Sequence, residues 1–358
     1  MKTEQIFSSD NSTLLDVQNQ GMISIAQLRH QSVNTLDYIS VHRAFYENLL
    51  KIEEVSESGN VNELLLTNLS SKYIFIMDGD ILKGAKQNRI VNASILIGPN
   101  VKMVIPVSCV EQGRWAYDSN NFSGSDEVAY RKIREQKNRD IYNNRNYARE
   151  KHRVNQSRVW DEVQNCFADS QSYSSTASHS DNFNAKRMDY TSMTSSFTLH
   201  DNANGLAYFI NGNLCGVEVF NKTDVYREYF HKILLSVAMD AEIIMRKFEY
   251  LNRADLSMDH ARLSIEDTLN DFKENLNRID ICNGICLGKE FRLITDKEIF
   301  YNLSFNEQPV HQSILSFEKD GSDNRNNRPN RPTEPMDSSE IRGRSRHSRL
   351  SRFFRAEE

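Results

Sequence analysis

Residues 78–92 have the sequence Asp78-Gly-Asp-Ile-Leu-Lys-Gly-Ala-Lys-Gln-Asn-Arg-Ile-Val-Asn92, and residues 106–115 have the sequence Pro106-Val-Ser-Cys-Val-Glu-Gln-Gly-Arg-Trp115. Both segments are dense in charged and amide side chains. The apolar sequence between them predicts two buried strands, residues 94–97 and 101–108, joined by a turn at Gly98-Pro-Asn100. Two polar clusters at the ends of buried strands are typical of a site held by a rigid frame.

The sequence N-terminal to this stretch predicts mostly β-structure. Ser40 is expected to cap a brief helix that runs to Leu49. Pro106 places the strand 101–108 at a sheet edge or a bulge, because proline has no N–H to donate. Residues 1–20 are polar and are expected to be flexible. Further strands are expected at residues 36–39, 50–55, 62–68, 72–77 and 87–91.

The sequence after Trp115 predicts a polar helical middle. Residues 126–142 and 149–166 have helical periodicity, with one apolar stripe made of Val154, Val159, Trp160, Val163 and Phe167. The region is also basic, with Arg131, Lys132, Arg134, Lys137, Arg139, Arg145, Arg149, Lys151, Arg153 and Arg158. Interleaved acidic residues favour a solvated helix face over a surface that meets phosphate. The Ser-rich residues 171–184 predict a loop, and residues 118–205 as a whole are expected to be polar and partly flexible.

The C-terminal half begins with a strong hairpin signal. Residues 206–210 and 213–220 flank Asn211-Gly212, which suits a type I′ turn. Asp224 is expected to cap a long amphipathic helix, whose apolar stripe consists of Val225, Tyr229, Phe230, Ile233, Leu234, Val237, Ala238, Ala241, Ile244 and Met245. A helix from Ser264 to about Leu276 follows, and strands are expected at residues 278–281, 290–295, 299–305 and 311–317. The predicted fold class is α+β.

Composition is compatible with one domain that holds all of these elements. The chain has 358 residues, a formal net charge of −5 and five cysteines, and a single core at residues 21–318 is expected. Few, scattered cysteines indicate a reducing compartment, and no run of about 18 apolar residues marks a membrane span, so a cytoplasmic protein is expected. Residues 319–358 form an Arg-rich tail that is expected to be disordered. This tail is either an appendage without a specific partner or a contact for nucleic acid or an acidic partner.

Glycines and cations in the first polar segment favour the binding of an anion. Gly84 allows close backbone approach, and Lys83, Lys86 and Arg89 supply positive charge for a phosphate or a carboxylate. The segment departs from the P-loop template, because a strand follows it and no hydroxyl residue comes after Lys86. The alternative is a β-bulge turn whose cations pair with nearby carboxylates, namely Asp78, Asp80 and Glu111.

Four residues are candidates for catalysis: Asp78, Asp80, Cys109 and Glu111. The adjacent Arg114 would lower the thiol pKa of Cys109 and make it a nucleophile, if the fold also brought His311 near. The carboxylates suit a general base or oxygen ligands for Mg²⁺ or Ca²⁺. Each candidate has a structural alternative, since buried cysteines are commonly core residues and carboxylates near cations commonly form salt bridges. The sequence therefore assigns no metal site.

Two other features have a structural and a functional interpretation. Cys282-Asn-Gly-Ile-Cys286 lacks the second Cys or His pair of a structural zinc site, which favours a core role. Trp115 and Tyr117 border the polar segments. Their rings are suited either to cap a sheet edge or to stack on a planar ligand.

Both polar segments resemble the signature of one family, the domain associated with ADP-ribosylglycohydrolases and rhodanese-type phosphatases. The resemblance is carried by residues 78–89 and 106–115, and it extends to Val159-Trp-Asp-Glu-Val163 and to the hairpin residues Asn211, Gly212, Gly216 and Phe220. It covers about residues 20–315. Asp80 stands where the family commonly has glutamate, which keeps the carboxylate but shortens its reach. The resemblance implies a link to ADP-ribose, NAD or nucleotide-phosphate metabolism and no particular reaction.

The leading hypothesis is a domain that binds a phosphate-bearing small molecule of nucleotide or ADP-ribose type. The expected roles are phosphate contact by Lys86, Arg89 and Arg114, polar contact by Asn88 and Gln112, and stacking by Trp115, with Gly84 and Gln87 completing the site. One alternative is a hydrolase or transferase that acts on such a ligand through the four candidate residues. Another is a non-enzymatic protein-interaction module that uses the tail. The sequence identifies no cofactor and does not define the oligomeric state.

Overall fold

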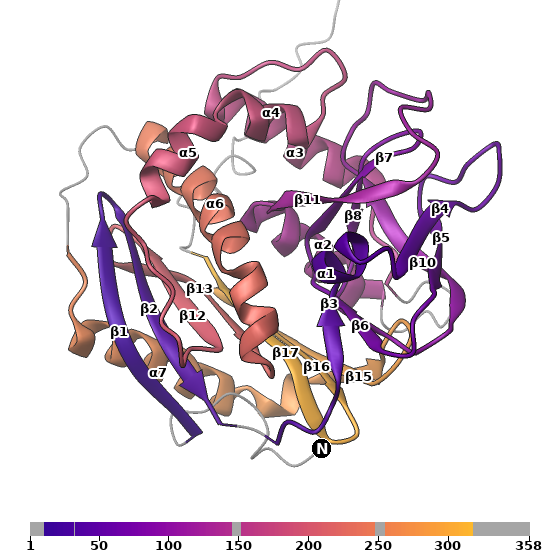
Figure 1. The fold of residues 1–358 in the computed structure, drawn as a ribbon. Helices are drawn as coiled ribbons and strands as arrows, with labels where there is room; N and C mark the ends of the chain where they lie inside the picture. The colour runs from indigo at the N-terminus through magenta and orange to yellow at the C-terminus, as the bar shows by residue number, and fades with distance from the viewer. Residues whose placement is uncertain (1–10, 32, 145–151, 248–254, 318–358) are drawn as a thin grey trace, which may run out of the picture. The chain divides into compact units, whose positions relative to one another are not determined.

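An eight-stranded antiparallel sheet is built around the Asn211-Gly212 hairpin (Figure 1). The structure, a computed structural model, describes residues 11–31, 33–144, 152–247 and 255–317. Asn211 (φ 51°) and Gly212 (φ 80°) adopt the left-handed backbone of a type I′ turn, as predicted. The strand order is β1 (Ser12–Gln20), β2 (Ile23–His30), β12 (Gly205–Ile210), β13 (Asn213–Phe220), β17 (Gln308–Ser316), β16 (Glu298–Phe305), β15 (Lys289–Ile294) and β14 (Asp280–Asn283).

Both faces of this sheet are buried, each against a different helix (Figure 1). Along β12, Leu206 and Tyr208 belong to the core that includes α6 (Thr223–Lys247). Ala207 and Phe209 belong to the core that includes α7 (Met258–Glu274). Because successive strand side chains point to opposite faces, a strand covered on both sides has a continuous apolar sequence.

Replacing Gly216 with alanine should lower the free energy of unfolding by about 1–3 kcal/mol, as overpacking in a filled core does. Gly216 is paired with Tyr208 across β12 and β13. A Cβ at this position would lie 2.2 Å from the Tyr208 hydroxyl oxygen and 2.7 Å from the Ile314 carbonyl oxygen. Urea unfolding measures the loss. The same glycine substitution should cost less in a Tyr208→Ala background, and an equal cost in both backgrounds would contradict this explanation.

A six-stranded sheet carries the two polar segments. Its order is β11 (Phe122–Val128), β7 (Asp80–Gly84), β8 (Arg89–Val91), β10 (Lys102–Cys109), β5 (Glu63–Asn68) and β4 (Leu50–Glu54). β10 pairs with β5 up to Pro106 and with β8 from Val107. Pro106 therefore lies where β10 changes partners, rather than at the predicted sheet edge or bulge, and a residue without an N–H fits this position. A third sheet joins β3 (Tyr38–Ser40), β6 (Tyr73–Ile76) and β9 (Ile95–Ile97).

The helices confirm several predictions, and the fold class is α+β. Ser40 caps α1 (Val41–Tyr46) by accepting a hydrogen bond from the Arg43 N–H, although the helix ends before Leu49. The predicted apolar stripe of α6 is buried as far as Ala241, whereas Met245 is exposed. Within the described ranges, no helix has both the length and the apolar character that crossing a membrane requires. The remaining α-helices are α2 (Arg131–Asn143), α3 (Gln156–Ser170), α4 (His179–Ala185) and α5 (Arg187–Thr194), and η4 (Leu276–Arg278) is a short 3-10 helix.

Some element predictions are wrong where tertiary pairing outweighs the local pattern. β1 occupies residues expected to be flexible, and a bulge between Leu14 and Asp16 breaks the alternation that would have marked it as a strand. β11 takes residues 126–128, so the helix predicted from 126 begins at Arg131. α4 and α5 form in the polar region that was expected to be loop or partly flexible, where Phe183 and Tyr190 supply the buried contacts.

Helix starts in the C-terminal half also differ from the predictions. α7 is capped by Ser257 and begins at Met258, before the predicted Ser264. Asp224 lies in the first turn of α6 rather than at the cap position. The described elements all belong to one unit, residues 1–318. The predictions for residues 1–10, 145–151 and 319–358, including the Arg-rich tail, fall outside the described residues.

Candidate functional site

β8 and β10 bring the two polar segments together. Arg89 is paired with Cys109 in their register. The chain enters β8 through a turn at Gly84 (φ 118°), where a Cβ would lie 2.4 Å from Ser119 Oγ and 2.9 Å from the Asn121 carbonyl oxygen. Only glycine fits this backbone and this contact. Residues 84–89 and 109–115 therefore lie beside one another, as the site hypothesis requires.

Arg114 ties the second segment to the first through Glu111. Its Nε and Nη2 donate to the Glu111 carboxylate at 2.9 and 2.7 Å, and its Nη1 donates to the Ala85 carbonyl oxygen at 2.6 Å. Glu111 also accepts from the Asn88 backbone N–H at 3.0 Å and the Thr176 hydroxyl at 3.1 Å. Burial opposes ionisation of Glu111, but Arg114 and the other donors outweigh it and hold its pKa below the ordinary value. These contacts make the Glu111–Arg114 pair a link between loops.

Arg89 is fully buried and has donors without acceptors. Its Nη1 donates to the backbone and side-chain oxygens of Gln87 at 3.0 and 3.2 Å, and its Nη2 lies 3.6 Å from Glu54 Oε1. In the described part of the chain, Arg89 Nε, Arg89 Nη2 and Glu54 Oε2 have no hydrogen-bond partner. Burial lowers the pKa of the Arg89 guanidinium. Buried donors without acceptors cost free energy, so these atoms are suited to bind oxygen atoms of a ligand.

Trp115 and Tyr117 place exposed aromatic rings beside two cations. Lys86 Nζ lies 5.3 Å from the Trp115 ring centroid and 5.1 Å from that of Tyr117. Arg89 Cζ lies 5.8 Å from the Trp115 centroid. Trp115 is 47% exposed and Tyr117 is 51% exposed, so both rings retain surface for a further contact. We refer to Glu54, Lys86, Arg89, Trp115 and Tyr117 as the Arg89 cluster.

Sequence reasoning missed Glu54, although its strand holds a signal. β4 alternates, with Leu50 and Ile52 on its buried side. Glu54 continues that side and is also buried. A carboxylate at an apolar position of an alternating strand requires a buried partner, and Arg89 is the cation beside it.

Cys109 does not have the surroundings of an activated nucleophile. It is buried, its thiol has two acceptors within reach, Gln87 Oε1 and the Glu111 carbonyl oxygen, both 3.1 Å from Sγ, and burial raises its pKa. His311 is hydrogen-bonded elsewhere, to Ser94 and Glu218. These contacts support the core alternative. Gln112, a predicted polar contact, lies at the surface.

Asp78 is the centre of a buried network of ion pairs. Lys137 Nζ lies 2.5 Å from Asp78 Oδ1, and Arg134 Nε lies 3.4 Å from Asp78 Oδ2. Arg134 Nη1 reaches Glu218 Oε1 at 2.5 Å, and Glu218 Oε2 meets His311 Nε2 at 2.9 Å. Burial opposes ionisation of Asp78, but Lys137 and Arg134 outweigh it and hold its pKa below the ordinary value.

This network corrects the prediction that the basic helix face is solvated. Arg134 and Lys137 are both buried. The sequence did contain a signal, because Ile133, Lys137 and Ile141 are spaced by four and share one face of α2. A lysine within an apolar stripe requires an acidic partner in the fold. That partner, Asp78, lies far away in the sequence.

Asp80 and Lys83 belong to two further, separate clusters. Asp80 accepts from the Tyr229 hydroxyl at 2.6 Å and pairs with Lys232. Lys83 pairs with the buried Glu127 at 3.1 Å. Asp78, Asp80 and Glu111 thus pair with different cations rather than facing one common point.

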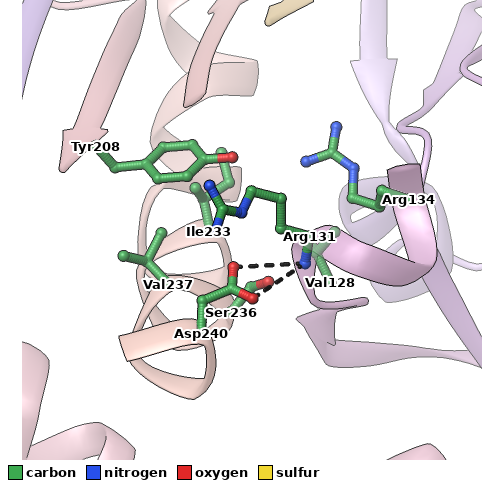
Figure 2. Close-up of a pocket in the computed structure, with 8 residues that line it drawn as sticks. All are labelled: Val128, Arg131, Arg134, Tyr208, Ile233, Ser236, Val237 and Asp240. Atoms are coloured by element: carbon green, nitrogen blue, oxygen red, sulfur yellow. Dashed lines mark hydrogen bonds between the residues drawn. The ribbon is translucent and has the colours of Figure 1, made fainter. Parts of the chain in front are cut away.

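Figure 2 shows a small cavity between α2, α6 and β12. The Asp240 carboxylate accepts hydrogen bonds from the Arg131 backbone N–H at 3.3 and 3.4 Å. Burial raises the pKa of Asp240 to about 6, although Arg131 lies beside it. The cavity volume of about 10 Å³ suits about one water molecule and excludes a nucleotide. Its lining consists of Val128, Arg131, Arg134, Tyr208, Ile233, Ser236, Val237 and Asp240.

A larger hollow of about 590 Å³ lies between the end of α2 and the start of α3. Asp140 and Arg158 on its wall pair with each other at 2.9 Å. None of the predicted site residues lines it, and its lining consists of Asn62, Asp140, Asn143, Asn144, Arg153, Val154, Asn155, Gln156, Ser157 and Arg158.

Comparison with known proteins identifies one family. The model of the ARG and Rhodanese-Phosphatase-superfamily-associated Protein domain matches residues 11–315. No curated protein and no solved structure matches the chain. The match covers every described strand except the last residue of β17, and it includes all members of the Arg89 cluster.

Proposed function

Since the chain belongs to the family of ARG and rhodanese-phosphatase-superfamily-associated protein domains, we propose that it binds a phosphate-bearing small molecule of nucleotide or ADP-ribose type at the Arg89 cluster. The observation that carries this proposal is the buried Arg89 guanidinium, whose Nε and Nη2 have no hydrogen-bond partner in the described ranges. Phosphate oxygens match the planar donor geometry of a guanidinium. The association of the family with ADP-ribosylglycohydrolases supports a ligand of this class.

The other members of the Arg89 cluster complement a nucleotide. Lys86 supplies a second positive charge for phosphate beside Arg89. The exposed rings of Trp115 and Tyr117 are suited to stack on a base. Glu54 Oε2, which has no hydrogen-bond partner within the described residues, is suited to accept a hydrogen bond from a ribose hydroxyl.

Three other predicted ligand residues, Gln87, Asn88 and Arg114, hold the cluster in place through contacts within the protein. The Asn88 backbone N–H and the Arg114 guanidinium donate hydrogen bonds to the Glu111 carboxylate, and Arg114 also donates to the Ala85 carbonyl oxygen. Gln87 holds Arg89 Nη1 through two oxygens. We assign these residues to positioning, and this leaves Lys86 and Arg89 as the cations that would bind the phosphate once the side chains over the buried Arg89 move aside.

The proposal concerns binding rather than turnover. The candidate carboxylates are each paired with a different cation, and the Cys109 thiol is buried with a raised pKa. These contacts support structural roles. Catalysis by Asp78, Asp80, Cys109 or Glu111 stays a prediction, which an assay for turnover of the bound ligand would test.

Saturating ligand should raise the melting temperature of the wild-type protein in a thermal-shift screen. The probes are ADP-ribose, NAD, ADP, ATP and cyclic nucleotides, and a ligand at a hundred times its Kd stabilises the folded state by about 2.7 kcal/mol. The shift should be lost or strongly reduced in Lys86→Gln and Arg89→Gln, because each loses a charged contact to phosphate. The melting temperature without ligand shows whether each variant remains folded.

Lys51→Gln is the matched control for this screen. Lys51 lies on β4, the strand that supplies Glu54, and its ammonium pairs with Glu53 at the surface at 2.7 Å. Lys51→Gln removes one positive charge, as the two test variants do, but leaves the Arg89 cluster unchanged. The rise in its melting temperature on adding ligand should therefore equal that of wild type. An equal shift in folded Arg89→Gln protein would place the ligand elsewhere and refute the proposed site.

A further inference from the structure

We propose a divalent metal site of the Zn²⁺-binding kind, made by His152, Cys282 and Glu290. Cys282 and Glu290 are direct partners in the antiparallel pairing of β14 and β15, so their side chains leave the same face of the sheet. His152 lies in the segment that leads into α3. One ligand atom from each residue lies within 4.8 Å of the other two. The site shares no residue with the Arg89 cluster, and the two proposals are independent.

The donor atoms lie close enough together for a tetrahedral ion to bind after side-chain adjustment. Zn²⁺ binds His nitrogen and carboxylate oxygen at about 2.0–2.1 Å and Cys sulfur at about 2.3 Å, which puts its ligand atoms about 3.3–3.6 Å apart. His152 Nε2 and Glu290 Oε1 are 3.0 Å apart. For this pair a movement of about 0.3 Å would let an ion replace the hydrogen of that bond, and the Cys282 side chain, whose sulfur lies within 4.8 Å of both atoms, would adjust to complete the site.

The donor types select among metals. A thiolate and an imidazole favour Zn²⁺, whereas Mg²⁺ and Ca²⁺ take oxygen ligands. The three residues leave a fourth tetrahedral position, which a water molecule would fill. Binding would release the Cys282 thiol proton to solvent, because only the thiolate binds the metal.

Buried neighbours hold two of the three ligands in place. Asn92 Nδ2 donates to the His152 carbonyl oxygen at 3.0 Å. Arg292 Nη1 pairs with Glu290 Oε2 at 2.8 Å, which fixes the carboxylate and leaves Oε1, the oxygen next to His152, to bind an ion. Contacts of this kind orient metal ligands. The charge of Arg292 opposes a nearby cation, but the carboxylate and the thiolate together supply two negative charges that offset it.

Cys282 gives an ion access from outside. It is half-buried and lies on β14, the edge strand of the eight-stranded sheet. Cys286, four residues later, is not one of the three ligands. The sequence favoured a core role for residues 282–286 because no second ligand pair follows nearby, whereas the fold supplies the partners from β15 and from residue 152.

Cobalt(II) titration of the full-length protein tests the site. Co²⁺ replaces Zn²⁺ at such ligands, and a bond to thiolate gives an intense charge-transfer absorption in the near ultraviolet. We expect one equivalent of Co²⁺ to produce this absorption and one equivalent of Zn²⁺ to abolish it. Cys282→Ser should remove the absorption. His152→Gln should weaken Zn²⁺ affinity by more than about 100-fold, measured by competition with a chromophoric chelator.

Cys286→Ser is the matched control, because it removes a cysteine of the same segment and leaves the three ligands intact. Its absorption and its Zn²⁺ affinity should equal those of wild type. Absence of the charge-transfer absorption in the wild-type protein would overturn the proposal. Retention of the absorption in Cys282→Ser, or its loss in Cys286→Ser protein whose melting temperature is unchanged, would also overturn it.

Discussion

Replacing Asp78 with alanine should lower the free energy of unfolding by about 3–5 kcal/mol, the range expected when one partner of a buried ion pair is removed. Asp78 is the carboxylate that lies between Lys137 and Arg134, at 2.5 and 3.4 Å. Arg134 keeps Glu218 as a second partner, whereas Lys137 keeps only the Val91 carbonyl oxygen among its described hydrogen bonds. The variant therefore leaves an ammonium group buried without a counter-charge.

Urea unfolding of two further variants isolates the charge pair. Asp78→Asn/Lys137→Met removes both charges with little change in volume and should cost less than the sum of the single changes. Glu135→Ala is the control on the same helix, because Glu135 forms an ion pair with Arg139 nearer the surface at 2.8 Å. That change should cost less than about 1 kcal/mol. If Asp78→Ala lowered the free energy of unfolding by no more than Glu135→Ala does, the ion-pair network around Asp78 would contribute little to stability.

Asp240→Asn should flatten part of the dependence of stability on pH. The pKa of Asp240 is raised from 3.8 to about 6 in the folded protein, mainly by burial. Its carboxyl group therefore stabilises the folded state fully below the unfolded pKa, and this contribution is lost as pH rises through 6. The positive groups beside it, Arg131, Lys132 and Arg134, lower the pKa but do not outweigh burial.

The quantity to measure is the difference in the free energy of unfolding between Asp240→Asn and wild type, and this difference should change with pH. Asparagine cannot ionise, so Asp240→Asn should gain stability relative to wild type by on the order of 3 kcal/mol between pH 4 and pH 7. Urea unfolding measured at intervals of about half a pH unit resolves a change of that size in the free energy of unfolding. Ser236→Ala, which alters the same cavity without an ionisable group, should parallel wild type. Parallel curves for Asp240→Asn would show that the folded pKa is not raised.

Local signals in the sequence were sufficient for the elements that depend on neighbouring residues. Asn211-Gly212 predicts the hairpin because its turn geometry requires residues that tolerate positive φ. The apolar stripe predicts α6 because helical periodicity is a property of the segment alone. The two polar segments do lie beside each other, but through the pairing of β8 with β10. Of the two strands predicted between the segments, the first is β9, which belongs to a different sheet from β10.

Partners that lie far apart in sequence could not be predicted in this way. Lys137 is buried because it pairs with Asp78, which lies 59 residues earlier in the sequence. β1 has a polar sequence and is a strand because β2 pairs with it. Arg89 faces Glu54 rather than a carboxylate of its own segment. Charge patterns alone give equal weight to many pairings, and only the fold selects one of them.

The fluorescence of Trp115 is the most direct measure of nucleotide binding at the Arg89 cluster. The chain has two tryptophans, so Trp160→Phe leaves Trp115 as the single reporter within the Arg89 cluster. ADP-ribose or another nucleotide from the thermal-shift screen should change this emission saturably, with one site. Arg89→Gln should raise the Kd by about 10–100-fold, the loss of a charge-assisted hydrogen bond of about 1.5–3 kcal/mol. Two results would contradict binding at the Arg89 cluster. One is binding by calorimetry that leaves the Trp115 emission unchanged and has the same Kd in Arg89→Gln, and the other is no binding of any of these ligands.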